Sequence, residues 1–410
     1  MTSPNPNPRV LVIGAGPSGL AIAQGLKKAS IPCTVFERQP QNLESRDWGM
    51  LLHWGTPYLL KTLPPELQAR IHEPRVDPHY DYSEPPKRMN IQTGEVVGRS
   101  VGENLVRVSR RKLRNFLIEG VDVRWEKRLA DVRVGEGGVT AVFEDGSEEV
   151  GQLLVGSDGG RSRVREVLLG VEAARSEETP FTMMNFSEAK YTAEQARFLR
   201  SVHPIVQLGY HPGEKCVAFL AAIDTADPDP AGWRFQNFIS WAGPPSTKDL
   251  EDPMARAHFW KEKAANFCEP FRTAVLNIDD SAVPPIDALK QWAPRYWDNL
   301  GGRLTLAGDA AHSMVPNRGQ GLNNAVQDAS CIVDAVVSVV KGESTLKDAI
   351  DTYEAEMKPR GKKEVEMSYE AARITSRLID VPMGYEYNLD KDSTARGVKA
   401  AGGKSGTGWD

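Results

Sequence analysis

The chain has 410 residues, a length that fits two or three domains with a substantial hydrophobic core. Its 50 basic and 55 acidic side chains give a net charge of -5 without any basic block, which argues against nucleic acid as the main partner. No apolar run approaches the roughly 20 residues that a membrane span needs. The four cysteines lack C-x-x-C spacing and the seven histidines lack metal-binding spacing. We therefore expect no metal site, and free thiols in a reducing, cytoplasmic compartment.

The N-terminal region starts with a polar, disordered tail, residues 1–8, and continues with the pattern of a dinucleotide-binding unit. Apolar residues 10–13 predict a buried parallel strand, and the G-x-G-x-x-G run at 14–19 opens a helix directly after it. A second strand, 33–36, ends at the acid Glu37, near the spacing at which such an acid binds a ribose. Because glycines admit a pyrophosphate and a helix N-terminus neutralises it, this pattern predicts a dinucleotide site.

The following segment mixes strands and helices up to about residue 174. Residues 48–54 predict a strand that leads into a helix, and Thr93-Gly94 marks a hairpin. Ser109 is placed to cap a helix over 110–119. Further strands are expected at 121–125, 129–134 and 139–143, and a buried parallel strand from 153 leads into Asp158-Gly159.

Residues 175–300 have a different pattern, with long strands around two helices, and predict a mixed β-sheet beside the nucleotide-binding part. Part of the segment 72–108 is expected to join this sheet. The expected strands are 181–186, 205–210, 216–223 and 233–241, and the expected helices are 193–199 and 252–266. Five of the nine tryptophans lie here. They are either ordinary core residues or, for a few of them, the lining of a pocket for a flat substrate.

The C-terminal part returns to the nucleotide-binding pattern. Residues 304–306 predict a strand, Gly308-Asp309 a turn, and the loop up to Gly321 a close backbone approach to a ligand, before a helix whose N-terminus faces that ligand. Helices are expected at 323–341 and 345–379, and a mobile tail at 383–410. The predicted fold is α/β: a Rossmann-like domain of 9–174 and 301–382 with the inserted sheet.

Three separated stretches together resemble the class A flavoprotein monooxygenases, the para-hydroxybenzoate and salicylate hydroxylase family. They are Gly14 to Gly19 with Glu37, the Asp-Gly motif that starts at Gly156, and the Gly-Asp motif that runs from Gly308 to Asn323. A fourth segment, from Val108, is similar to the family's V-x-R-x-x-L-x-x-x-L element, with Arg110 as its arginine. The resemblance covers roughly residues 9 to 375.

The resemblance implies tightly bound, non-covalent FAD and transient NADPH or NADH. Asp309 would bind the ribityl chain, the amides near Gly321 the flavin ring, and Asp158 both cofactors, although Asp158 alone also fits a plain turn aspartate. The implied cofactor-binding residues are Gly14, Gly16, Ser18, Gly19, Glu37, Arg38, Arg110, Asp158, Gly159, Gly308, Asp309, Pro316, Gly319, Gly321, Leu322 and Asn323.

The implied activity is a monooxygenase that uses NAD(P)H and O2, through a flavin C4a-hydroperoxide, to hydroxylate or epoxidise a hydrophobic, electron-rich ring compound. The residues around Asp47 and His53 look like members from secondary metabolism. A reductase or saturase of the same superfamily, and a non-catalytic flavin-binding regulatory protein, are the alternatives. We expect a monomer or homodimer.

Three side chains are candidates for catalysis or substrate contact. Arg318 departs from the family's usual loop, and it either clamps a substrate or stabilises the anionic ring, or else faces solvent or pairs with an acid. His53, beside Trp54, is expected at the pocket, where the alternative is a hydrogen-bonded core residue. Tyr210 is the candidate base. His312, by contrast, is expected to pack the loop.

Overall fold

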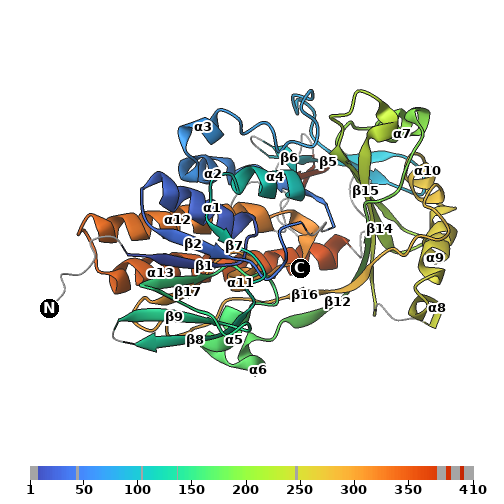
Figure 1. The fold of residues 1–410 in the computed structure, drawn as a ribbon. Coiled ribbons are helices and arrows are strands. Elements are labelled where there is room, and N and C mark those ends of the chain that lie inside the picture. The colour runs from blue at the N-terminus through green and yellow to red at the C-terminus, as the bar shows by residue number, and fades with distance from the viewer. Residues whose placement is uncertain are drawn as a thin grey trace.

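Two larger sheets, two smaller ones and the helices packed against them build the described part of the molecule (Figure 1). A computed structural model describes residues 8–42, 46–102, 105–135, 137–244, 248–375, 385–388 and 398–400. The α/β class predicted from the sequence is confirmed, with a parallel sheet and a larger mixed sheet. Among the described helices, none is both long and apolar enough to cross a membrane.

The parallel sheet has the strand order β17-β11-β1-β2-β7. Its strands are β1 (Val10–Ile13), β2 (Cys33–Phe36), β7 (Val123–Arg124), β11 (Leu153–Gly156) and β17 (Leu304–Leu306). The strands β1, β11 and β17 are completely buried, as expected for a parallel sheet covered on both faces. These strands bring the three sequence motifs to one edge, because each motif follows the carboxyl end of one strand.

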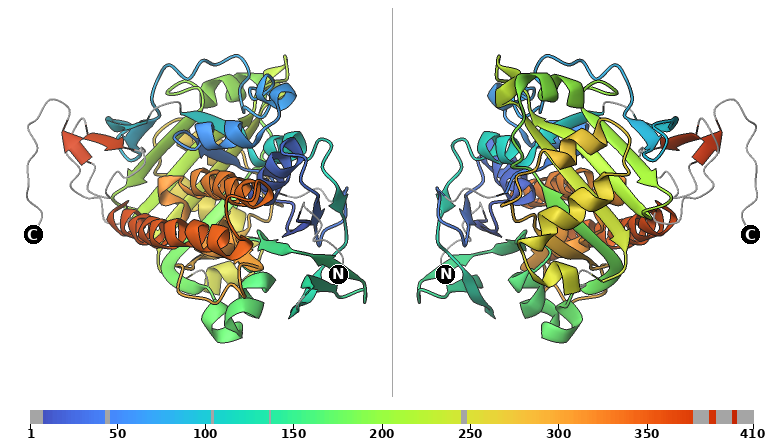
Figure 2. Two further views of the ribbon diagram at one scale, coloured as in Figure 1. Left: turned by 90° about the vertical axis from the view of Figure 1, so that its left-hand side faces the viewer. Right: turned by 90° about the vertical axis from the view of Figure 1, so that its right-hand side faces the viewer.

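Two helices run side by side over this sheet, α1 (Pro17–Lys28) and α12 (Gly321–Val340). They pack closely, since a Cβ added to Gly25 would lie 2.5 Å from a methyl group of Val333. The long helix α13 (Leu346–Thr375) lies beside α12 (Figure 2). Nearby elements are α11 (Asp309–His312), η2 (Pro316–Arg318), α5 (Arg163–Leu169), α6 (Val171–Ala174) and the small sheet β8 (Leu129–Gly135), β9 (Gly138–Phe143) and β10 (Glu148–Gly151).

The large sheet has nine strands in the order β16-β12-β15-β14-β13-β4-β5-β18-β19. They are β4 (Lys87–Asn90), β5 (Val96–Val101), β12 (Glu177–Phe186), β13 (Val206–His211), β14 (Cys216–Asp224), β15 (Arg234–Ala242), β16 (Ile286–Gln291), β18 (Tyr385–Asn388) and β19 (Val398–Ala400). The helices α9 (Ala255–Ala264) and α10 (Phe271–Leu276) lie over one face, seen from outside in Figure 2. The strands β4 and β5, from the segment 72–108, belong to this sheet.

A two-stranded ribbon, β3 (Gly49–Leu52) paired with β6 (Val106–Ser109), links the two parts. After β6, the hydroxyl of Ser109 accepts a hydrogen bond from the N–H of Lys112 and so caps α4 (Arg110–Leu117), as the sequence predicted. After β3, the short helices α2 (Thr56–Thr62) and α3 (Pro65–Gln68) follow. The remaining helices are α7 (Ala193–Leu199), η1 (Pro230–Gly232) and α8 (Lys248–Glu251).

Some elements differ from the expectation. The helix expected at 252–266 is shorter, because it corresponds to α9 alone, and α8, β16 and α5 were not predicted. Within the expected mobile tail, β18 and β19 extend the large sheet beyond β5. The rest of that tail, and residues 1–7, lie outside the described residues.

Candidate active site

The first and second motifs are in direct contact. Gly14 has φ +106, and a Cβ there would lie 2.5 Å from the carbonyl oxygen of Ser157. The Ser157 hydroxyl in turn lies 2.9 Å from the carbonyl oxygen of Ile13. Only glycine therefore fits at position 14. The fit places the Asp-Gly motif against the dinucleotide-binding turn.

The third motif touches the other two. A Cβ on Gly308 would lie 3.0 Å from the hydroxyl of Ser18 at the start of α1. From α5, Arg165 donates hydrogen bonds to the carbonyl oxygens of Ala310 (3.0 Å) and Gly160 (2.6 Å). Three segments from distant parts of the sequence thus form one site.

A cleft of about 680 Å³ opens where the first two motifs meet, and its lining includes no residue of the third motif. Seven of the predicted cofactor residues line it: Gly14, Gly16, Glu37, Arg38, Arg110, Asp158 and Gly159. Its lining has six basic side chains, Arg38, Arg110, Lys127, Arg128, Arg161 and Arg163. Four acidic side chains oppose them, Glu37, Glu144, Asp158 and Glu166. The excess of positive charge suits an anionic ligand such as a pyrophosphate.

The start of α1 fits such a group. The N-cap position, Gly16, has no side-chain cap, so the first N–H groups of α1 remain available. A Cβ on Gly16 would meet no atom within 4 Å, which leaves space beside the helix end. The buried hydroxyl of Ser18 has no hydrogen-bond partner in the described part of the chain. An open helix end, free space and an unpaired hydroxyl together form a cradle for phosphate oxygens.

The start of α12 repeats this feature at the other motif. Gln320 precedes α12 without a side-chain cap, and Gly321, Leu322 and Asn323 supply the first N–H groups of the helix. The side chain of Asn323 is already used, because its Oδ1 accepts hydrogen bonds from the N–H groups of His53 (3.0 Å) and Gly55 (3.1 Å). Any contact of Asn323 with a cofactor therefore falls to its backbone.

Glu37 lies at the end of β2, where the sequence placed the ribose contact. Its carboxylate accepts hydrogen bonds from the N–H groups of Ala15 and Gln39, both at 2.9 Å. Each oxygen keeps a further lone pair for a ligand hydroxyl. The residue thus braces the glycine turn and can still bind a ribose.

Arg110 begins α4 and lies over the ring of Trp48, with its guanidinium carbon 4.5 Å from the ring centre. Burial lowers its pKa, and the negative charges of Glu37 and Asp309 oppose that shift. Arg110 therefore lies within the electrostatic range of an acid from each of two motifs, which suits a contact with the middle of a dinucleotide.

Asp158 has a structural task. Its carboxylate accepts hydrogen bonds from the Ser162 hydroxyl (2.5 Å) and from the N–H groups of Arg163 (2.7 Å) and Val164 (3.2 Å). These contacts cap α5, which matches the alternative of a turn aspartate. Burial raises the pKa of Asp158. Its role toward FAD and NAD(P)H stays a prediction.

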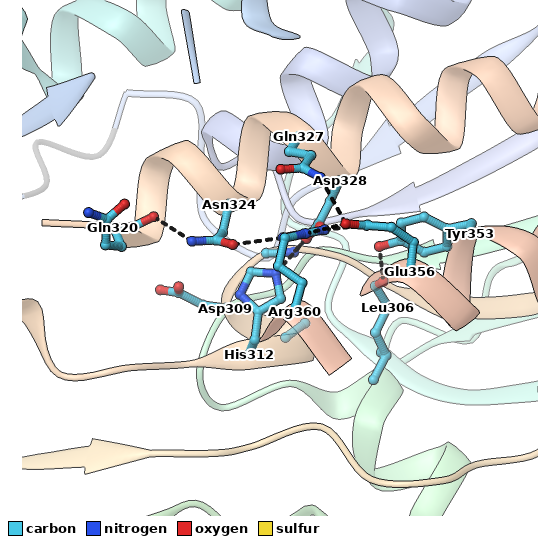
Figure 3. A network of polar contacts seen from close by, with 12 residues as sticks. Leu306, Asp309, His312, Gln320, Asn324, Gln327, Asp328, Tyr353, Glu356 and Arg360 are labelled. Carbon is cyan, nitrogen blue, oxygen red and sulfur yellow. Dashed lines mark hydrogen bonds and ion pairs between the residues drawn. The ribbon is translucent and has the colours of Figure 1, made fainter. Parts of the chain in front are cut away.

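Asp309 is the first residue of α11, and its carboxylate has no hydrogen-bond partner among the described residues (Figure 3). It is solvent exposed and lies 3.9 Å from where a Cβ on Gly321 would be. The surrounding protein nevertheless removes enough water to raise the pKa of this carboxyl group. An unpaired acid beside an open helix end is free to bind a hydroxylated ligand.

The three catalytic candidates are all buried. Arg318 is 2% exposed and forms an ion pair with Glu364 at 2.8 Å, which is the acid-pairing alternative. His53 lies between β3 and α2, and Tyr210 lies on β13, where burial raises its pKa. None of these observations tests a catalytic role, so the three roles stay predictions.

The sequence interpretation missed three residues that hold the site together: Asp328, Arg360 and Glu364. Asp328 offered one signal, since Ala325, Cys331 and Ile332, which lie one turn away on the same helix face, are apolar. An acid at such a position needs a buried partner.

Residues 7–368 match the family described as FAD binding domain, and the chain belongs to this family. It is 37% identical over 381 residues to FAD-dependent monooxygenase phnB of Penicillium herquei, which covers 91% of this chain and 92% of that protein. It is 36% identical over 364 residues to FAD-dependent monooxygenase cctM of Talaromyces islandicus, covering 88% and 91%. The protein is therefore an FAD-dependent monooxygenase by family.

Klebsiella pneumoniae HpxO, solved with FAD and uric acid, shares the fold with a TM-score of 0.72 at 21% identity, covering 90% of this chain and 89% of that one. The family membership confirms the resemblance drawn from the three motifs, and FAD is the cofactor that this family binds. It favours a monooxygenase over the reductase and over the regulatory flavoprotein.

Proposed function

We propose that this monooxygenase uses NADPH or NADH and O2 to hydroxylate or epoxidise a hydrophobic, electron-rich ring compound. When bound, FAD supplies the hydride acceptor and the activation of O2. The observation that carries the proposal is a cleft lined by the first two motifs, with the third motif in contact with the start of α1 and the N-termini of α1 and α12 both left without a side-chain cap. The fungal relatives named above support a role in secondary metabolism.

In this proposal the chain's own residues divide the cofactor between them. The start of α1, with Gly16 and Ser18, binds the diphosphate, and Glu37 binds the adenosine ribose. Asp309 binds the ribityl chain. The open N-terminus of α12 lies next to it and stabilises negative charge on the pyrimidine edge of the ring.

The substrate lies, in this proposal, against the large-sheet face turned away from α9 and α10. There the rings of Phe219 and Phe238 stack with centroids 4.5 Å apart and planes 6° apart, and both are half-buried. Tyr210 lies on the same face, because it pairs with Val217, two residues from Phe219. An aromatic wall of this kind holds a flat ring and excludes water.

The test is anaerobic reduction of the FAD-loaded protein by NADPH and by NADH, with and without a panel of ring compounds. We expect one class of ring compound to accelerate the bleaching of the flavin absorbance. After air is admitted, its product should gain one oxygen atom by mass spectrometry. Faster reduction without oxygen incorporation would establish a reductase, and a chain that never takes up FAD would end the proposal.

Compartment and assembly belong to the same proposal. The four cysteines are free thiols, and burial raises the pKa of Cys33 and of Cys216 to about 12, which keeps both protonated and unreactive. These features support a reducing, cytoplasmic compartment. Size-exclusion chromatography with light scattering distinguishes a monomer from a homodimer, the two states that we expect.

A further inference from the structure

A buried carboxylate on α12 holds the short helix that carries Asp309. The Oδ2 atom of Asp328 accepts a hydrogen bond from the N–H of Gly308 at 2.7 Å and another from Nε2 of His312 at 2.6 Å. Gly308 immediately precedes α11, and His312 is its last residue. One oxygen atom therefore binds both ends of α11, as Figure 3 shows around His312.

The other oxygen of Asp328 faces a cation from α13. Its Oδ1 accepts a hydrogen bond from Arg360 at 2.7 Å, and Arg360 also binds Asn324 Oδ1 at 2.7 Å and the carboxylate of Glu356 (Figure 3). Burial acts to raise the pKa of Asp328, but His312 and Arg360 outweigh it, so the pKa is lowered and the group is ionised. An ionised carboxylate only accepts, so Nε2 of His312 carries the proton in this contact.

A helix of four residues cannot fix its own position, because helix formation is favourable only over longer segments. The position of α11 is therefore set from outside, by Asp328 at both ends and by Arg165 on its carbonyl oxygens. Helix α13 adds a close contact, since a Cβ on Gly361 would lie 2.9 Å from the Cβ of His312. The element held in this way presents one unpaired side chain, that of Asp309.

We propose that Asp328, with His312 and Arg360, is a positioning residue that aims the Asp309 carboxylate at FAD. The inference rests on the proposed FAD site but concerns residues that do not line the cleft. If it holds, the affinity for FAD depends in part on Arg360 of α13, a helix that packs beside α12 and carries no cofactor motif. Asp328 and Asp309 then act in series, and the loss of either one removes the same contact.

A double-mutant cycle on FAD affinity tests this series. Asp309→Ala, Asp328→Asn and the double variant are compared with wild type by titrating each apoprotein with FAD and following the quenching of flavin fluorescence. We expect each single variant to bind FAD at least about tenfold more weakly, the effect of losing a hydrogen bond to a charged group. In the Asp309→Ala background, Asp328→Asn should change the affinity less than about twofold.

Two further comparisons separate positioning from general support of the fold. Glu366→Gln is the matched control, because Glu366 is exposed on α13, where it pairs with Lys362, and does not touch Arg360 or α11; it should bind FAD like wild type. His312→Gln keeps an N–H donor toward Asp328 and should retain most of the affinity that His312→Ala loses. The His312 pair also serves as the test if Asp328→Asn does not fold.

Additive effects of Asp309→Ala and Asp328→Asn would overturn the inference, as would equal losses in His312→Gln and His312→Ala. These outcomes leave the proposed function intact, since wild type would still bind FAD. Failure of wild type to bind FAD, by contrast, contradicts the proposed function itself.

Discussion

At the scale of single residues, two glycines of the turn that follows β1, Gly16 and Gly19, are required for different reasons. A Cβ on Gly16 would meet nothing within 4 Å, whereas a Cβ on Gly19 would lie 2.2 Å from the carbonyl oxygen of Gly14. Gly16 has φ -81, which any residue can adopt. The two glycines of one motif therefore serve different ends: Gly19 lets the chain pack, and Gly16 leaves room for the pyrophosphate.

The first prediction follows from this difference. Gly16→Val should fold, with the apoprotein destabilised by no more than about 2 kcal/mol, because the new methyl groups enter open space and the loss is limited to that of a poorer N-cap residue. FAD affinity should fall at least about tenfold, since those methyl groups occupy the phosphate space. Urea unfolding of the apoprotein and FAD titration measure the two effects. Gly19→Val is the contrast and should lose the fold. A yellow, fully loaded Gly16→Val protein would contradict the assignment.

The second residue-scale prediction concerns pH. Because the pKa of Asp309 is raised above its ordinary value of 3.8, the folded apoprotein binds that proton more tightly than the unfolded chain does. The stability gained from binding this proton is fully present below the ordinary pKa of Asp309, and it is lost as the pH rises through the raised pKa of the folded protein. Asp309→Asn should therefore be more stable than wild type at neutral pH, and the difference should shrink on acidification. Urea unfolding of both apoproteins between about pH 4 and about pH 7 measures this. A difference that does not change with pH would show that Asp309 does not carry the shift.

Residue types and spacing were enough to place Gly14, Gly16 and Glu37 at one cleft. They were not enough to show which carboxylates of the site are already hydrogen-bonded to the protein's own backbone. The carboxylate of Asp158 caps α5, and that of Glu37 braces the glycine turn. Both contacts depend on local backbone geometry, which a motif implies only loosely.

At the scale of elements, the loop before α12 is fixed by α13. Arg318 in η2 pairs with Glu364 on α13, and both side chains are less than one-tenth exposed. The sequence predicted the loop and both helices but left the partner of Arg318 open. The two residues are separated by 46 positions, and no local pattern encodes a pair at that distance.

Removing one partner of this pair gives the third prediction. Glu364→Leu leaves the Arg318 guanidinium buried without its acid, which should lower the free energy of unfolding by about 3–5 kcal/mol. Adding Arg318→Met should recover most of that loss, because two apolar side chains of similar size replace the pair. Urea unfolding of the two single variants and the double variant completes the cycle. Equal stability of Glu364→Leu and the double variant would show that the buried charge is not the cause.

At the scale of the whole molecule, the β3–β6 ribbon joins the nucleotide-binding part to the large sheet. Arg107 donates hydrogen bonds to the carbonyl oxygen of Ala222 (3.1 Å) and to Oε1 of Gln236 (2.6 Å). Gln236 also accepts from the N–H of Gly49 at 3.0 Å. These contacts cross more than 100 positions of sequence, so the sequence could predict two parts but not how they meet.

The last prediction separates the two parts by function. Gln236→Leu removes the oxygen that both Arg107 and Gly49 bind, and leaves the buried Arg107 donor without this partner at the junction, a cost of about 1–3 kcal/mol. The cleft is built only from the nucleotide-binding part, so FAD affinity should stay near that of wild type. The aromatic wall belongs to the large sheet, so the acceleration of flavin reduction by a ring substrate should fall several-fold. Stopped-flow reduction with and without substrate measures this split.

Gln92→Leu, the same substitution at an exposed position beside β4, is the control and should leave both quantities unchanged. A Gln236→Leu protein with a full substrate response would mean that the junction does not position the wall.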